Sequence, residues 1–482
     1  MTIQRAAWTV LAPLGVCLLL AGWIAMSAAN FEAASFSILI FGLANLIVYT
    51  DALDYGLRLY VHRRHTATAR EGDDTSDLSI NIGAALPHGA RRVVPTSPYA
   101  IIASVFNLED DVEAFIEAFA AYRERVWLVS DGSTDNTVMR LRRAGWRCLE
   151  EPVNRRKPGA VRALLETLPD TIATIMVIDP DIRILARGAG SSIDLERFIG
   201  DFQLSGAAAA CPRVVIEPDG FLARFQAFEY ALAFRVGRAS LSDFSITSGA
   251  VSLYRRDALV LALQEHSLSV YAEDFENAMI LLGHGERIYY DGRLVVSTEG
   301  PGSVSRWFSQ RVGWYHGLLK VYTERFSSIW RVSRRTPFAL YHFIVYIGVL
   351  SLGLHLVKIL SAVLLVASFV RGLDRLLLDN WISAGALTNP VYFTAAIGSY
   401  LALGVIALFT SVPKSERAYV APIVPIYLFY AIAHIAPMSV GFGNWIALKL
   451  WGRRLFHDHY EPRPHGAVAQ DELQSDDERS AA

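Results

Sequence analysis

Long apolar runs flank one central stretch of mixed character in this chain. Apolar segments cover residues 8–29 and 34–50, and three further apolar blocks follow the central stretch at residues 338–370, 391–410 and 419–440. A helix that spans a bilayer needs roughly 20 predominantly apolar residues. The first segment is too long for the apolar part of a signal peptide, and the second follows it almost at once. Together the two predict a helical hairpin across a membrane.

The three later blocks predict further membrane helices. The block at 338–370 is longer than one span needs, so it is either an interfacial helix that leads into a span or one long tilted helix. Lys414 and Arg417 place the loop after the second block inside, which fits a crossing out and back. The third block precedes the basic stretch KLWGRRL and is either a crossing or a re-entrant or interfacial element. We expect four spans, with the fifth element undecided.

The central stretch predicts a cytoplasmic α/β domain. Arg58, Arg63 and Arg64 follow the second span, and under the positive-inside rule they hold the next region in the cytoplasm. Strand-like and helix-like segments then alternate, which indicates βαβ units and a largely parallel sheet. The predicted strands are 99–106, 125–130, 173–178 and 207–216, and the predicted helices are 109–122 and 157–168.

These patterns divide the chain into consecutive regions. We predict an N-terminal transmembrane hairpin (1–57), a basic and polar linker (58–97), the cytoplasmic domain (98–302), interfacial helices (303–337), a C-terminal membrane region (338–456) and a disordered acidic tail (457–482).

Composition supports a membrane protein and argues against one class of partner. The chain is 52% hydrophobic and 19% charged, with a mean hydropathy of +0.29. The net charge of −2 gives no indication of a nucleic-acid partner. Cys17, Cys148 and Cys211 are widely spaced and form neither a disulfide framework nor a metal site, which fits a reducing cytosolic face.

Carboxylates follow two of the predicted strands, at the edge where open α/β sheets bind ligands. Asp131 stands in VSDGSTDNT, which is alternatively a strand–turn–helix junction capped by polar side chains. Asp179 and Asp181 stand one residue apart in MVIDPDIRI. Two close carboxylates repel unless a cation lies between them, and Mg²⁺ or Mn²⁺ prefers such oxygen ligands together with phosphates. The alternative for this pair is a proline turn with solvated acids.

A second acidic pair and a small-residue segment follow further along the chain. Glu273 and Asp274 in YAEDFENAMILLGHG begin an amphipathic helix, whose dipole keeps a carboxylate ionised, as a general base needs. Simple N-terminal helix charge is the alternative. Upstream, Ser248 and Gly249 in ITSGAVSLYRR have small side chains that let a bulky ligand approach the backbone.

The stretch FSQRVGWYHG lies just before the first C-terminal apolar block. On a helix, Gln310, Trp314 and Gly317 share one face, which places an amide beside an indole. The aromatic residues here are alternatively part of a membrane-interface belt.

Taken in order, these features resemble those of the membrane-embedded family 2 glycosyltransferases. The order is a DGS turn, DxD, a small SGA segment, ED, and a glutamine–tryptophan pair before membrane helices. Cellulose, hyaluronan, chitin-oligosaccharide and poly-N-acetylglucosamine synthases belong to that family, and the resemblance covers nearly the whole chain. It implies a GT-A (Rossmann-like) domain inserted between transmembrane helices, with interfacial amphipathic helices, in the inner (plasma) membrane of a bacterium.

The resemblance also implies roles on the donor side. Asp131 would contact the uridine of a UDP-sugar, and Lys157, in RRKPGAVRAL, would lie near the nucleotide. Asp179 and Asp181 would hold the metal ion, Mg²⁺ or Mn²⁺, and the diphosphate. Gln310 and Arg311 are counted as further donor-binding candidates.

On the acceptor side, the resemblance implies that Asp274, with Glu273 beside it, deprotonates the acceptor hydroxyl for inverting attack at the anomeric carbon. Trp314 would stack on the acceptor sugar, near Ser248 and Gly249.

One position departs from the family's Q-x-x-R-W pattern. Gln310 and Trp314 match, but Gly313 occupies the place of the arginine. Arg311 lies about 200° around the helix from Gly313, so it cannot simply substitute. Either another cation, Lys157 or Arg306, serves the diphosphate, or Gly313 leaves room for an acceptor that is held differently.

The predicted function is elongation of a β-linked exopolysaccharide from UDP-glucose or UDP-N-acetylglucosamine, with translocation of the product across the membrane. The alternatives are transfer of one sugar to a membrane lipid, and a non-catalytic scaffold or transporter. His355 and Lys358 share a face of the 338–370 block and either line a glycan path or, for Lys358, snorkel to an interface. The expected partners are the donor, the growing glycan, the bilayer and a regulatory or export chain.

Overall fold

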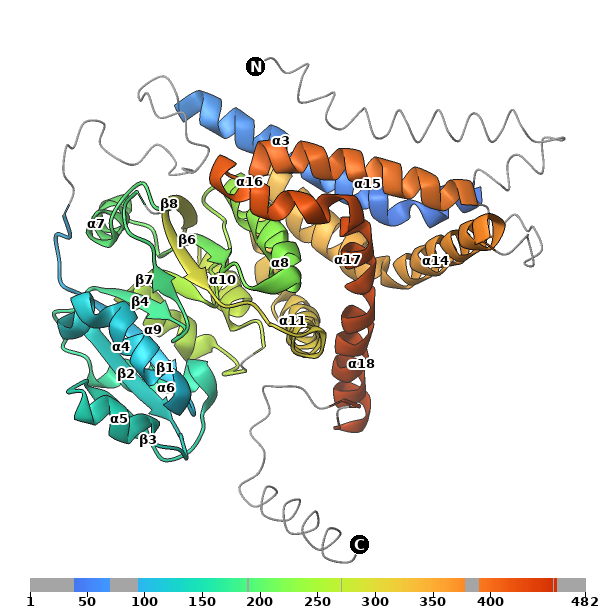
Figure 1. Ribbon diagram of the computed structural model, residues 1–482. Coiled ribbons are helices and arrows are strands. Elements are labelled where there is room, and N and C mark those ends of the chain that lie inside the picture. The colour runs from blue at the N-terminus through green and yellow to red at the C-terminus, as the bar shows by residue number, and fades with distance from the viewer. Residues whose placement is uncertain are drawn as a thin grey trace, which may run out of the picture.

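The computed structural model describes residues 39–69, 94–188, 190–269, 271–377, 390–453 and 455–456. The first predicted span, most of the linker and the acidic tail lie outside these residues. In the described part, an α/β domain lies beside a group of long helices (Figure 1).

The α/β domain contains one eight-stranded mixed sheet in the order β3-β2-β1-β4-β7-β6-β8-β5. The first four strands in this order are parallel, whereas β7 runs antiparallel to both of its neighbours. The strands are β1 (Tyr99–Val105), β2 (Val126–Asp131), β3 (Cys148–Glu151), β4 (Thr174–Ile178), β5 (Arg183–Ile184), β6 (Ala209–Ile216), β7 (Val251–Arg255) and β8 (Ile288–Thr298). All four predicted strands are present, and the α/β class is confirmed.

Helices cover both faces of the sheet, which gives two hydrophobic cores. One core joins the sheet to α6 (Arg156–Thr167), α9 (Arg256–Glu265) and α10 (Glu273–Gly283), and the other joins it to α4 (Val112–Phe119) and α7 (Leu195–Ser205). Strand β4 is buried along its whole length between these cores, as its apolar sequence TIMVI requires. The residues that follow β4 are therefore held firmly at the edge of the sheet.

The predicted helix at 109–122 is shorter than expected. Its α-helical part is α4 alone, with one 3₁₀ turn before it, η1 (Glu109–Asp111), and another after it, η2 (Ala120–Arg125). Another helix, α5 (Thr137–Arg143), follows the DGS turn, and α8 (Gly220–Leu232) continues into the π-helical η3 (Ala233–Arg238).

Among the described residues, three helices are long and apolar enough to cross a membrane: His355–Asp374, Val391–Ser411 and Lys414–Trp451. They correspond to α14 (His355–Leu377), α15 (Pro390–Ser411) and the run α16 (Lys414–Val420), η6 (Ala421–Ile426), α17 (Tyr427–Ala433) and α18 (Ile435–Trp451). Figure 1 shows α15 beside α3 (Leu46–Ala69), whereas α18 runs across that direction toward α11 (Val304–Glu324). The third predicted block is thus not one straight helix.

Two boundaries differ from the prediction. The helix α3 continues through Arg58 to Ala69, into the region predicted as linker. It does so because Arg58 is buried and paired: its Nε lies 2.7 Å from Asp54 Oδ2, and its Nη2 lies 2.8 Å from His342 Nδ1. A positive-inside pattern cannot distinguish such a buried arginine from one in a loop.

The block at 338–370 is interrupted. After α12 (Phe326–Ser333) and α13 (Pro337–Leu340), the π-helical η4 ends at Gly353, and α14 begins at His355. His355 binds neighbouring protein, because its Nε2 lies 3.0 Å from Ser439 Oγ and its ring packs edge-on against Phe442. The interpretation of a short apolar helix that leads into a span is the one that agrees with the structure.

Candidate active site

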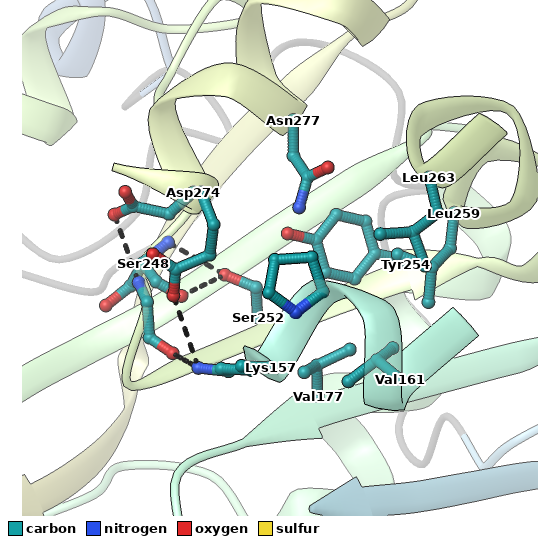
Figure 2. Close-up of a pocket in the computed structure, with 13 residues that line it drawn as sticks. Lys157, Val161, Val177, Ser248, Ser252, Tyr254, Leu259, Leu263, Asp274 and Asn277 are labelled. Carbon is teal, nitrogen blue, oxygen red and sulfur yellow. Dashed lines mark hydrogen bonds and ion pairs between the residues drawn. The ribbon is translucent and has the colours of Figure 1, made fainter. Parts of the chain in front are cut away.

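A pocket lies where β4, β7 and the first turns of α6 and α10 meet. Figure 2 shows the side chains of Lys157, Ser248 and Asp274 gathered on one side of it. Its other wall is apolar and is formed by Val161, Val177, Tyr254, Leu259 and Leu263. The pocket therefore joins charged groups to a wall that excludes water.

Lys157 connects three parts of this pocket. Its Nζ lies 2.5 Å from Asp179 Oδ1, donates a 2.5 Å hydrogen bond to the carbonyl oxygen of Gly249, and lies 3.5 Å from Glu273 Oε1. Burial lowers the pKa of Lys157, but the Asp179 and Glu273 carboxylates outweigh burial and raise it above its ordinary value. Lys157 is therefore a fixed positive charge among carboxylates.

Asp274 and Glu273 stand at the first turn of α10, after Ala272 in the left-handed conformation with φ of 53°. Asp274 Oδ2 accepts a hydrogen bond of 3.1 Å from the Gly249 N–H, and Oδ1 accepts one of 2.8 Å from the Phe275 N–H. Burial raises the pKa of Glu273 to about 7, with Lys157 opposing the shift and Asp274 adding to it. Asp274 is thus held in one orientation, beside a carboxyl that resists ionisation.

Asp179 and Asp181 follow β4 directly. The Asp179 N–H donates to the Ala250 carbonyl at 2.8 Å, and Asp181 Oδ2 accepts a 2.7 Å hydrogen bond from Thr298 Oγ1. Partial removal from water, together with Asp179, raises the pKa of Asp181 to about 6, although the residue still has a solvent-exposed part. The described residues contain no cluster of three or more His, Cys, Asp or Glu side chains that would hold a metal by itself.

This pair nevertheless fits a magnesium-type ion. Such an ion is usually bound through one or two carboxylates, with substrate phosphates and water as the other ligands. The raised pKa of Asp181 indicates uncompensated negative charge beside Asp179. A bound cation would remove that excess charge, so the residues present agree with the predicted Mg²⁺ or Mn²⁺.

Asp131 lies at the end of β2, away from the pocket that Lys157 lines. It is 3% exposed, and its Oδ1 accepts a 2.6 Å hydrogen bond from the Arg155 N–H. Burial raises the pKa of Asp131. Gly132 has φ of +74°, and a Cβ there would lie 2.7 Å from the Asn154 nitrogen. Asp131 therefore fixes the loop that leads into α6 and hence to Lys157.

The three candidates on α11 lie together. The Arg311 guanidinium stacks on the Trp314 ring at 3.8 Å, and its Nη1 donates a 3.0 Å hydrogen bond to Gln310 Oε1. Its Nη2 lies 2.6 Å from Glu229 Oε2. The angular argument that separated Arg311 from Gly313 holds for the backbone, but the long side chain reaches the face that carries Gln310 and Trp314.

The other two explanations for the missing arginine are now constrained. Arg306 is exposed at the start of α11, and Gly313 is buried. One turn later, a Cβ on Gly317 would lie 2.7–2.8 Å from atoms of Tyr271 and Ala272. This close approach of α11 to α10 places Trp314, which is 39% exposed, next to the helix that carries Asp274.

Sequence reasoning missed three polar residues that shape this region. Thr298 binds Asp181, Glu229 binds Arg311, and Arg238 donates to the carbonyl oxygens of Ile246 and Thr247. Glu229 gave one usable signal, since it is a lone charge in the apolar helix FLARFQAFEYAL. The other two lie at ordinary polar positions and become visible only through tertiary packing.

The sequence matches no protein-family model and no curated protein. Among solved structures, the chain is similar to the mannosyltransferase PcManGT from Pyrobaculum calidifontis in complex with GDP-Man and Mn²⁺. The identity is 17% and the TM-score 0.47, over 82% of this chain and 99% of that one. It is also similar to glucosyl-3-phosphoglycerate synthase from Mycobacterium tuberculosis with Mg²⁺ and UDP, with 14% identity and a TM-score of 0.30, over 47% of this chain and 79% of that one. These likenesses are too distant to carry a functional argument.

Proposed function

We propose that this chain is an inverting family 2 glycosyltransferase of the bacterial inner membrane that elongates a β-linked exopolysaccharide from a UDP-sugar. The observation that carries the proposal is the arrangement around Lys157. One buried cation binds Asp179, Glu273 and the Gly249 carbonyl, while Asp274 is held 3.1 Å from the Gly249 N–H. A base, a cation and a metal-type carboxylate pair thus lie within one small region.

In this proposal Asp274 accepts the proton of the acceptor hydroxyl. The acceptor oxygen then forms a bond to the anomeric carbon as the bond from that carbon to the diphosphate breaks, and UDP leaves. General bases of this kind typically contribute 10²–10⁴-fold to rate. The two backbone N–H groups that bind Asp274 keep it ionised and oriented.

The donor side needs positive charge where the diphosphate departs. Asp179 and Asp181 would hold Mg²⁺ or Mn²⁺, which supplies charge neutralisation when bound. Lys157 orients Asp179 and supplies a second positive charge close to it. Asp131 holds the loop before α6, which places Lys157 and would form one wall of the nucleotide site.

Elongation, as opposed to a single transfer, is supported by the position of α11. Trp314 presents a partly exposed ring, fixed by the Arg311 guanidinium, on which a sugar ring can stack. On the other side of α11, a Cβ on Gly441 of α18 would lie 2.7 Å from the Val312 carbonyl oxygen. The proposed acceptor site is thus in direct contact with a helix of the membrane region, where a growing glycan would enter the membrane.

The test is turnover by the full chain in nanodiscs, with Mn²⁺ or Mg²⁺ and each donor in turn: UDP-glucose, UDP-N-acetylglucosamine, UDP-glucuronate, and GDP-mannose as a donor with another base. UDP release and product size are measured together. Asp274→Asn removes the base while keeping its shape, and we expect it to lower kcat by about 10³-fold. Asp257→Asn, a first-turn acid on α9 outside the pocket, is the matched control and should change kcat little.

Each outcome decides between the alternatives. A high-molecular-weight product that is lost in Asp274→Asn supports the proposal and identifies the polymer. A lipid-sized product would replace elongation by single transfer to a membrane lipid. If no donor gives turnover that depends on Asp274, the proposed function is wrong.

A further inference from the structure

The segment 246–249 holds both the backbone and the carboxylate of Asp274. Thr247 Oγ1 donates a 2.7 Å hydrogen bond to the Asp274 carbonyl, and the Gly249 N–H donates to Asp274 Oδ2 at 3.1 Å. The segment lies between the π-helical η3 and β7, so it belongs to no regular element of its own. Its position, and hence that of Asp274, depends on what holds its carbonyl groups.

Arg238, the last residue of η3, holds these carbonyl groups from the opposite side. Its Nη1 donates to the Ile246 carbonyl and to the Thr247 carbonyl, the latter at 2.5 Å. Its guanidinium also stacks on the Phe234 ring at 4.6 Å, which fixes the plane of the guanidinium. The planar guanidinium of arginine suits such a bridge, and lysine cannot reproduce that geometry.

The turn that carries Arg238 is in turn bound by the helix α3. Arg58 Nη1 donates to the Gly237 carbonyl at 3.4 Å and to Ser240 Oγ at 3.5 Å. Ser240 Oγ donates to the same Gly237 carbonyl at 2.7 Å. Arg58 is itself fixed by its ion pair with Asp54. Polar contacts therefore run without a break from α3 to the proposed catalytic carboxylate.

We propose that Arg238 is a positioning residue for Asp274, and that Arg58 makes the α3 helix part of the scaffold of the active site. This inference rests on the proposed function, because it takes Asp274 as the base. Its physical basis is that catalysis is sensitive to small displacements, and a shift of about 1 Å can cost about 10²-fold in rate. Neither arginine needs to contact a substrate for this role.

The test compares Arg238→Lys with Arg224→Lys. Arg224 is a matched control, since it also stacks on an aromatic ring, that of Tyr419 at 4.7 Å, and donates to a backbone carbonyl at 3.0 Å, but it joins α8 to α16. We expect Arg238→Lys to lower kcat by about 10²-fold, with KM for the UDP-sugar nearly unchanged. Arg224→Lys should leave both constants near those of the unaltered chain.

Hydrogen exchange gives a second readout that needs no substrate. In Arg238→Lys and in Thr247→Val, we expect peptides that cover residues 246–249 and 273–277 to exchange faster, while β1 exchanges as before. Thr247→Ser keeps the hydroxyl and should restore protection. Arg58→Lys should affect the same peptides as Arg238→Lys.

The two measurements separate the two proposals. Faster exchange at these peptides without turnover in any variant would support the positioning role and overturn the proposed function. Exchange in Arg238→Lys that equals that in Arg224→Lys, or a larger change in KM than in kcat, would overturn the positioning role.

Discussion

Two lysine–carboxylate clusters lie on successive turns of α10 and differ in their charge balance. In the first, Glu273 and Asp274 share Lys157 with Asp179. The first cluster therefore has more carboxylates than cations.

In the second cluster, Glu276 is the centre. Lys320 Nζ lies 3.3 Å from Oε2 and Arg325 Nη2 lies 2.8 Å from Oε1, while Ser267 Oγ donates to Oε2 at 2.6 Å. Burial opposes ionisation, but the neighbouring His266 and the hydrogen bonds from Ser267 and Arg325 lower the pKa of Glu276 to about 2. This carboxylate is fully compensated.

The difference indicates which cluster waits for a ligand. A compensated buried carboxylate stabilises the native state, whereas a carboxylate whose pKa is raised, as that of Glu273 is to about 7, weakens it. Proteins tolerate such local costs mainly at functional sites. The same helix thus carries a structural acid and two acids suited to chemistry.

Substitution of the two lysines gives the largest expected contrast. Lys157→Gln removes the cation that orients Asp179 and the Gly249 carbonyl, and we expect kcat/KM to fall by about 10³-fold. Lys320→Gln should change it less than about threefold, because Lys320 contacts only the compensated cluster. The side chains are comparably buried, at 17% and 14% exposed. Steady-state UDP release measures both, and equal losses would remove the distinction between the clusters.

The next largest effect concerns stability, through Glu276→Gln. The substitution leaves Lys320 and Arg325 without their buried partner, and we expect it to destabilise the fold by about 3 kcal/mol near pH 7. The folded pKa of Glu276 is lowered from 4.5 to about 2, so its stabilisation is present above pH 4.5 and is lost as the pH falls toward 2. Thermal unfolding in detergent at pH 7 and at pH 3 measures this difference.

The variant should therefore approach the unaltered chain as the pH falls. A gap in the unfolding midpoint that stays constant between pH 7 and pH 3 would contradict the role of the ionised carboxylate.

Much of the fold was predictable because burial leaves a local pattern. Continuous apolar runs such as TIMVI predicted the parallel strands and their ends, and with them the positions of Asp131 and Asp179. The antiparallel strand β7 and the extension of α3 were not predictable in this way. Both depend on partners far away in sequence, β4 and His342 respectively.

The site was predictable only where its residues end a strand or begin a helix. Lys157, Asp179, Ser248, Gly249, Glu273 and Asp274 do meet in one pocket or at its edge. Arg238 and Thr298 enter through packing between elements, which leaves no spacing rule in the sequence. Arg311 was misjudged for another reason, because an angle between backbone positions ignores the reach of a long side chain.

The smallest expected effect is a gain in stability from Glu273→Gln. Folding raises the pKa of Glu273 from 4.5 to about 7, so its favourable contribution is complete below pH 4.5 and is lost as the pH rises through 7. At pH 8 the variant should therefore be more stable by about 1 kcal/mol, while at pH 4.5 the two proteins should unfold at nearly the same temperature. Thermal unfolding at both pH values decides this. A lower midpoint for the variant at pH 8 would show that the 3.5 Å contact with Lys157 outweighs burial, and the first cluster would then be compensated like the second.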